Sequence, residues 1–122
     1  MRNDCRRNRM DMEPLEINRS ALIAIAKQPF IEWLHTVDPS SGEIDLSAVN
    51  HEPSVYLVPV FDSDDDFTEW LEEHCHTIFE EQLGGWWTDQ RSWPPNRGIE
   101  VFQEWFECQR HSMVWDLDDE PL

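Results

Sequence analysis

One uninterrupted apolar run, ALIAIA at residues 21–26, constrains the fold more than any other feature of the sequence. A short apolar run without polar alternation is typical of a strand that is buried on both faces. Such a strand needs other elements to cover it. We therefore expect it to be the central strand of a sheet with helices packed on it.

Two segments have the apolar spacing of amphipathic helices. In the first, apolar residues recur at i, i+3, i+4 and i+7 after Pro29, which suits a first helical turn; they are Phe30, Trp33, Leu34 and Val37. In the second, Ser63 is expected to cap a long helix, with Asp66 at its third position, and Gly84 and Gly85 are expected to end it. The apolar stripe of the long helix comprises Phe67, Trp70, Leu71, His74, Cys75, Ile78 and Phe79.

The remaining pattern completes the predicted fold. We expect a short helix within residues 43–53, a further helix near 99–106, and strands at 55–61 and 112–117. The predicted order is therefore strand, helix, short helix, strand, helix, helix, strand. Because connections of helical length favour parallel pairing, the sequence predicts an α/β fold with a small three-stranded, mainly parallel sheet.

The chain of 122 residues is long enough for one domain, which we place at residues 14–118. Residues 1–13 lack apolar periodicity and are expected to be a disordered basic extension, with residues 119–122 as a solvated tail. The start of translation at Met1, Met10 or Met12 is left open, and a start at Met10 or Met12 would remove the basic arm. The side chains expected to be largely buried are Ile23, Ile25, Trp33, Leu57, Trp70, Phe79, Phe102 and Trp105.

The charge of the chain is strongly negative and unevenly spread. The net charge is -17, and no Lys or Arg occurs between Lys27 and Arg91. Four of the nine cations lie in the first ten residues, at Arg2, Arg6, Arg7 and Arg9. An acidic field repels phosphate backbones and attracts basic partners, so direct nucleic-acid binding is not expected. The other interpretation is that the charge serves only to keep the protein soluble and monomeric; the oligomeric state is left open.

The acidic face of the long helix is the leading candidate for a binding surface. It carries Glu69, Glu72, Glu73, Glu80 and Glu81, and it is followed by Trp86 and Trp87 in an aromatic loop. Tryptophan is enriched at the centres of protein interfaces, and an acidic surface beside it would suit a cationic protein partner. We therefore predict a non-enzymatic binding module of the inhibitor, immunity or adaptor type. The alternative for the loop is that its tryptophan rings fold back to cover a thin core.

A small metal-binding or enzymatic protein is the competing interpretation. It would use His74, His76, Cys108 and His111, of which only Cys108 and His111 have a ligand-like spacing. No GxSxG, HExxH or glycine-rich phosphate loop is present, so we expect neither catalytic residues nor a cofactor.

The location of the protein is predicted from its cysteines and its apolar content. Three cysteines, at 5, 75 and 108, show no CxxC spacing, which favours free thiols in a reducing compartment. No apolar run reaches the length of about 20 residues that a membrane span needs, and no signal-peptide pattern is present. A cytoplasmic protein without membrane association is expected.

Several longer segments carry a resemblance to known proteins. The segments are QPFIEWLHTVDP, SVYLVPVFDS with the acidic helix after it, WTDQRSWPP and HSMVWDL. Over residues 15 to 117 they resemble small acidic bacterial proteins of uncharacterised function, a likeness that implies element order and domain limits but no activity. The predicted element order is also similar to that of barstar, a small acidic ribonuclease inhibitor, in topology and charge.

Overall fold

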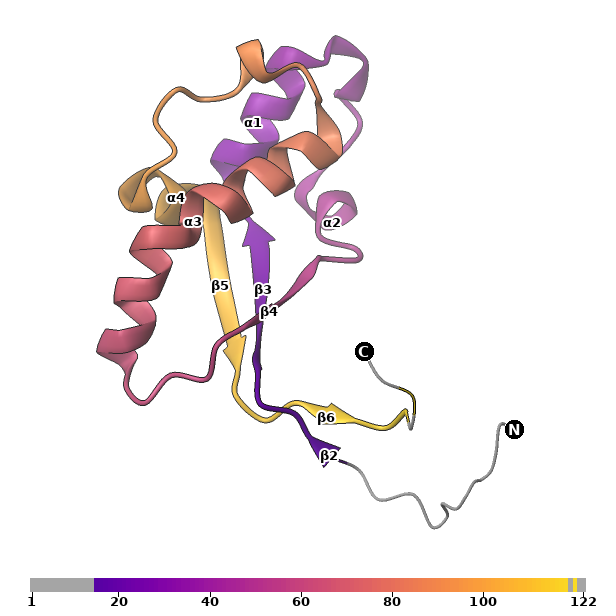
Figure 1. Ribbon diagram of the computed structural model, residues 1–122. Helices are drawn as coiled ribbons and strands as arrows, with labels where there is room; N and C mark the ends of the chain where they lie inside the picture. The colour runs from indigo at the N-terminus through magenta and orange to yellow at the C-terminus, as the bar shows by residue number, and fades with distance from the viewer. Residues whose placement is uncertain (1–14, 119, 121–122) are drawn as a thin grey trace. The chain divides into compact units, whose positions relative to one another are not determined.

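The computed structural model describes residues 15–118 and residue 120, so the extension expected at 1–13 lies outside the described residues. Figure 1 shows the elements in chain order. They are β2 Leu15–Glu16, β3 Ser20–Ala26, α1 Gln28–Val37, the 3-10 turn η1 Pro39–Ser41, α2 Leu46–Val49, β4 Val55–Val58, α3 Asp64–Trp86, the 3-10 turn η2 Gln90–Ser92, α4 Ile99–Trp105, β5 Phe106–His111 and β6 Trp115–Asp116.

The main sheet has three strands in the order β4-β3-β5, so the expectation that residues 21–26 form the central strand is confirmed. The prediction of a mainly parallel sheet is wrong, because the three strands are antiparallel. In Figure 1 the arrows of β3 and β5 point in opposite directions. The fold is thus mixed α and β, with an antiparallel sheet.

Two contacts at the carboxyl end of β3 explain the antiparallel arrangement. Ala26, the last residue of β3, donates its N–H to Asn50 Oδ1 at 2.9 Å and accepts from Asn50 Nδ2 at 3.0 Å. The chain therefore returns to this end of the sheet shortly before β4 begins. Lys27 donates its N–H to the carbonyl of Trp105 at 2.8 Å, immediately before β5 begins. Both outer strands thus start where β3 stops, and they must run back against it.

The same contact corrects the predicted third strand. The carbonyl of Trp105 accepts from Lys27, and α4 ends at this residue, so Phe106 already belongs to a strand. Residues 112–114, expected to begin the last strand, have no regular structure. Only Trp115 and Asp116 form β6, which pairs with β2 in a separate two-stranded sheet.

The chain divides into two compact units, whose boundaries fall inside β3, β4 and β5. Of the described residues, the first takes in 15–22, 56–60, 110–118 and 120, and the second takes in 23–55 and 61–109. In the first unit, Leu15 lies opposite Asp116 and Glu16 opposite Trp115 in an antiparallel pair. The N–H of Ile17 extends this pairing by donating to the carbonyl of Val114 at 2.9 Å.

Burial in β4 differs from the sequence-based expectation. Leu57 was expected to be buried, but 52% of its surface is exposed. The neighbouring Val58 is buried at 2% exposure, because successive side chains of a strand point to opposite faces. Val55 and Leu57 thus lie on the uncovered face of β4, and Val58 lies on the covered face.

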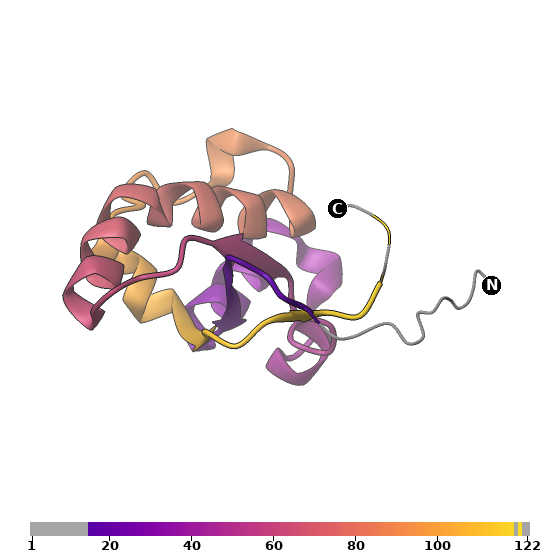
Figure 2. The same ribbon diagram turned by 60° about the horizontal axis from the view of Figure 1, so that its bottom comes forward.

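The core of the second unit is aromatic. Figures 1 and 2 show α1, α3 and α4 grouped around the carboxyl end of β3. Phe30 of α1, Phe79 of α3 and Phe102 of α4 are completely buried there, which confirms the expectation for Phe79 and Phe102. The expected core residues Ile23, Ile25, Trp33, Trp70 and Trp105 are only half-buried.

Helix α3 begins as predicted and ends later than predicted. The Ser63 hydroxyl accepts the N–H of Asp66 at 3.1 Å, which confirms the N-cap. Gly84 and Gly85 do not end the helix, which continues to Trp86. A Cβ at Gly84 would lie 3.6 Å from the ring of Trp93, an ordinary van der Waals contact, so the packing at this position does not require a glycine.

We expect Phe79→Ala to reduce the free energy of unfolding by about 3–5 kcal/mol, because it removes a fully buried ring and leaves a cavity. Urea unfolding followed by circular dichroism measures the change. Trp86→Ala is the matched control, since it truncates an aromatic residue of the same helix whose surface is 37% exposed. A loss no larger for Phe79→Ala than for the control would contradict the described core.

We expect Ser63→Ala to cost about 1 kcal/mol of stability, because the N–H of Asp66 loses its acceptor. Ser63→Asn keeps a side-chain oxygen at the N-cap and should recover most of the loss. Equal unfolding midpoints in urea for the two variants would show that the cap contributes nothing.

Candidate functional site

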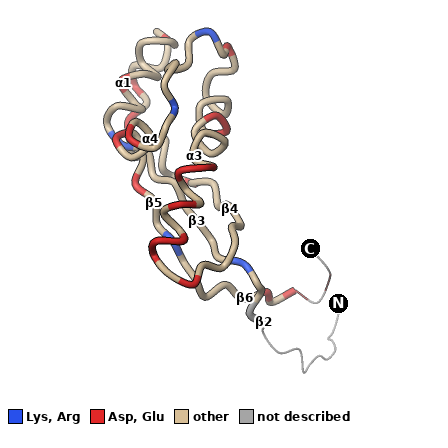
Figure 3. The backbone as a smooth tube through the Cα atoms, turned by 60° about the vertical axis from the view of Figure 1, so that its left-hand side comes forward, with Lys and Arg blue, Asp and Glu red and all other residues tan. Residues whose placement is uncertain are grey.

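The outer surface of the amino-terminal half of α3 is strongly acidic. Glu69, Glu72 and Glu73 are exposed, and no described Lys or Arg forms a salt bridge with them. In Figure 3 acidic positions follow one another along this helix. Pairs of like charges three and four residues apart destabilise a helix by about 0.2–0.5 kcal/mol each. This surface, which we call the acidic face of α3, therefore works against the stability of its own helix.

The first turn of α3 has a different role. Asp64, Asp65 and Asp66 lie at the positive end of the helix dipole, where carboxylates are stabilising. Their presence needs no partner to explain it. The acids that the helix itself does not explain are those beyond the first turn.

The structure separates the five glutamates that the sequence places on one face. Glu80 is half-buried and accepts from Arg97 Nε at 3.0 Å, so its charge is already balanced. Glu81 also makes an interaction within the structure. Glu69, Glu72 and Glu73 are left as the members of the predicted set that can meet a partner.

The cations of the second unit are already engaged. Arg91 binds Asp89 through Nε and Nη2, each at 3.0 Å, and these hydrogen bonds lower the pKa of Asp89 and raise that of Arg91. Lys27 donates from Nζ to the carbonyl of Gln103 at 2.9 Å. Arg97 is held by Glu80. None of these contacts neutralises the acidic face of α3.

The two tryptophans predicted to bind a partner lie in different environments. Trp86, the last residue of α3, is exposed. Trp87 is half-buried, and its Nε1 is buried without a hydrogen-bond partner among the described residues. Its carbonyl accepts from Trp93 Nε1 at 2.8 Å. Trp87 therefore belongs mainly to the packing of the loop, whereas Trp86 is available at the surface.

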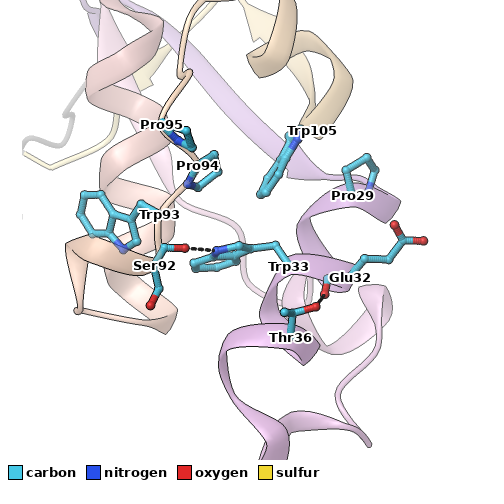
Figure 4. Close-up of a pocket in the computed structure, with 9 residues that line it drawn as sticks. All are labelled: Pro29, Glu32, Trp33, Thr36, Ser92, Trp93, Pro94, Pro95 and Trp105. Carbon is cyan, nitrogen blue, oxygen red and sulfur yellow. Dashed lines mark hydrogen bonds between the residues drawn. The ribbon is translucent and has the colours of Figure 1, made fainter.

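A pocket of about 460 Å³ lies within the second unit, a feature that the sequence did not predict. Figure 4 shows its walls: α1 on one side, the segment from Ser92 to Pro95 on the other, and Trp105 from the end of α4. We call it the tryptophan pocket. Its lining residues are Pro29, Glu32, Trp33, Thr36, Ser92, Trp93, Pro94, Pro95 and Trp105.

Hydrogen bonds and ring contacts fix the aromatic walls of the tryptophan pocket. Trp33 Nε1 donates to the carbonyl of Ser92 at 2.9 Å, which ties α1 to the loop. The rings of Trp33 and Trp105 are 6.2 Å apart between centroids and tilted by 53°. Phe30 lies 5.4 Å from Trp33 between ring centroids and supports it from the core. The rings are thus held in place before any ligand arrives.

Trp33 and Trp105 were expected to be core residues, and for this reason the sequence missed the pocket. Both have helical spacing that favours burial, and both are half-buried in the structure. The sequence signal that could have pointed to it is the pair Pro94-Pro95 directly after Trp93. Because the proline ring fixes the φ angle, two successive prolines make the loop locally rigid.

The alternative metal-binding set is not brought together. Among residues 15–118 and 120, no three His, Cys, Asp or Glu side chains form a group that could hold a metal ion. His74 is exposed and is not buried with the apolar stripe. Its ring stacks on that of Trp70 with 4.5 Å between centroids, and its Nδ1 lies 2.8 Å from the carbonyl oxygen of Trp70. His76 and His111 are exposed.

The two described thiols have the properties of structural cysteines. Burial raises the pKa of Cys75, which is 1% exposed. Burial likewise raises the pKa of Cys108 to about 11, with smaller contributions from Cys75 and Glu107. A raised pKa keeps a thiol protonated at neutral pH, and a protonated thiol is a poor nucleophile and a poor ligand.

We expect Cys75 and Cys108 to react slowly with iodoacetamide in a Cys5→Ser variant. At pH 8 a thiol with a pKa of about 11 is only about 0.1% thiolate, against roughly a quarter for a free cysteine. Alkylation of Cys108 should therefore be about 100-fold slower than that of N-acetylcysteine, and its rate should still rise above pH 10. Mass spectrometry of timed samples measures both rates, and equal rates at pH 8 would contradict the described burial.

Among the described helices, none is both long enough and apolar enough to cross a membrane. Comparison of the chain with protein-family models, curated proteins and solved structures found no match. The comparisons therefore do not bear on the resemblances drawn from the sequence, which stay predictions. Any function must be argued from the acidic face of α3 and the tryptophan pocket themselves.

Proposed function

We propose that this protein is a non-enzymatic binding module that engages a cationic protein through the acidic face of α3. The observation that carries the proposal is the set of three exposed glutamates, Glu69, Glu72 and Glu73, without a basic partner among the described residues. A partner with matching Lys or Arg side chains would replace repulsion within this face by attraction across an interface.

The distribution of cations supports a specific face rather than a general excess of acid. Arg91 forms a salt bridge with Asp89 and Arg97 forms one with Glu80, each with a nitrogen–oxygen distance of 3.0 Å. The acidic face of α3 receives no such pairing from the Lys and Arg residues that the structure describes. A surface that served only solubility could mix both signs without the cost of repulsion along the helix.

The proposal also fits the position of Trp86, which lies at the other end of the same helix. Its exposed ring could supply apolar contact area to a partner, as tryptophan often does at interfaces. An inhibitor, immunity or adaptor protein would use such a combination of charge and aromatic contact. A cytoplasmic location and a basic protein target are part of this proposal.

The test uses fluorescein-labelled decalysine as a cationic probe and follows its anisotropy at 50 mM and 300 mM NaCl. The variant Glu69→Lys/Glu72→Lys/Glu73→Lys should bind the probe about 10-fold or more weakly, because three attractive contacts become repulsive. The same variant should be as stable as the natural protein or slightly more so, since repulsions along α3 are replaced by attractions to the remaining acids.

The matched control is Glu43→Lys/Glu104→Lys/Glu107→Lys, which changes the net charge equally at three exposed acids outside α3. We expect it to weaken binding only a few-fold, through the long-range field. If the two triple variants lose affinity equally, only the total charge matters and the proposed face is an ordinary solvated surface. Absence of decalysine binding to the natural protein at 50 mM NaCl would also overturn the proposal.

A further inference from the structure

The tryptophan pocket is a second feature that can meet a partner, and it differs from the acidic face of α3 in chemistry. Its walls are mainly indole and pyrrolidine rings, and its lining includes one ionisable side chain, Glu32. No Lys or Arg among the described residues lines it. The charge of the pocket is therefore negative, and its surface is mainly aromatic and apolar.

Glu32 is available to a ligand. Its side chain is exposed, and its described contact is a hydrogen bond of 3.3 Å from Gln28 Nε2, slightly longer than the usual range. Figure 4 shows its carboxylate at the rim of the pocket, directed away from the rings. Because the side chain is exposed, it can turn toward a group that lies on the rings without disturbing the core.

The protein itself shows how such a set of groups binds a guanidinium. Arg97 places its Cζ 5.8 Å from the centroid of the Trp93 ring, donates from Nε to Glu80 at 3.0 Å, and donates from Nη1 to the carbonyl of Pro94 at 2.6 Å. An indole face, a carboxylate and a carbonyl together hold this side chain. Trp93 and Pro94 are also walls of the tryptophan pocket, so the groups that hold Arg97 lie directly beside this pocket.

From this geometry we infer that the tryptophan pocket binds an arginine side chain of the cationic protein partner, with the guanidinium in contact with the rings of Trp33 and Trp105 and paired with Glu32. The inference rests on the proposed function for the identity of the partner. A guanidinium is planar and weakly hydrated, so it stacks on indole faces and donates two parallel N–H groups to a carboxylate. An ammonium group can use the charge but not the planar contact.

The test uses a single residue as the probe and reads the signals of the pocket rings, so that binding at the acidic face of α3 is not what is measured. Nα-acetyl-arginine-methylamide is titrated into ¹⁵N-labelled full-length protein while the indole N–H signals are followed by NMR. The signals of Trp33 and Trp105, assigned with Trp33→Phe and Trp105→Phe, should move together to saturation. The lysine analogue should bind about 2- to 5-fold more weakly, and the neutral citrulline analogue more weakly still.

Glu32→Gln should weaken arginine binding about 2- to 5-fold, because the charge at the rim is lost while an exposed side chain of the same size remains. Glu104→Gln is the matched control, an exposed acid that does not line the pocket, and it should bind the probe as the natural protein does. Trp33→Leu should abolish the shift of the Trp105 signal. If this variant fails to fold, the comparison of the two glutamate variants still decides the question.

Three results would overturn the inference: no movement of the Trp33 and Trp105 signals, equal binding of arginine and citrulline probes, or unchanged arginine affinity in Glu32→Gln. None of these results would contradict the proposed role of the acidic face of α3, which the decalysine experiment tests separately. Conversely, the variant Glu69→Lys/Glu72→Lys/Glu73→Lys should keep its affinity for the single arginine probe. The pocket and the acidic face can therefore fail separately.

Discussion

The contact of Phe79 with its aromatic neighbours is the interaction on which the second unit depends. Its ring centroid lies 5.3 Å from those of Trp105 and Phe106 and 6.0 Å from that of Phe102. Through these contacts α3 is joined to α4 and to the first residue of β5. Phe30 adds α1 to the same cluster, at 5.5 Å from Phe106 between ring centroids. These phenylalanine rings form the centre of the core together with buried aliphatic side chains such as Leu34 and Leu83.

This core makes the acidic surface of α3 tolerable. Like charges beyond the first turn weaken the helix by a few tenths of a kcal/mol per pair. Burial of Leu71, Cys75, Ile78, Phe79 and Leu83 on the opposite side of the helix outweighs this cost, because one fully buried large apolar side chain contributes about 1.5–3 kcal/mol. A helix with so many acids on its outer surface is thus stable only while its inner surface is packed.

The tryptophan pocket arises from the same cluster. Trp33 and Trp105 lie against Phe30 with part of their surface, at 5.4 Å and 6.2 Å between ring centroids, and leave the rest of it uncovered. Both are half-buried and line the pocket with the part of the ring that remains accessible. The exposed remainder becomes a rigid aromatic wall, which a ligand can use without reorganising the protein. The same two side chains therefore contribute both to the core and to the proposed site.

The sequence by itself determined the local elements: the buried central strand at 21–26, the Ser63 cap and the acidity of α3 all follow from spacing and residue type within a few positions. Only the tertiary structure decided how these elements join. Asn50 binds Ala26, and Lys27 binds the carbonyl of Trp105, and these contacts over long sequence separations make the sheet antiparallel. They also fix which rings of a helix stripe are closed in and which remain at a pocket. Periodicity records the preference of a residue for burial, but not which distant residue arrives to cover it.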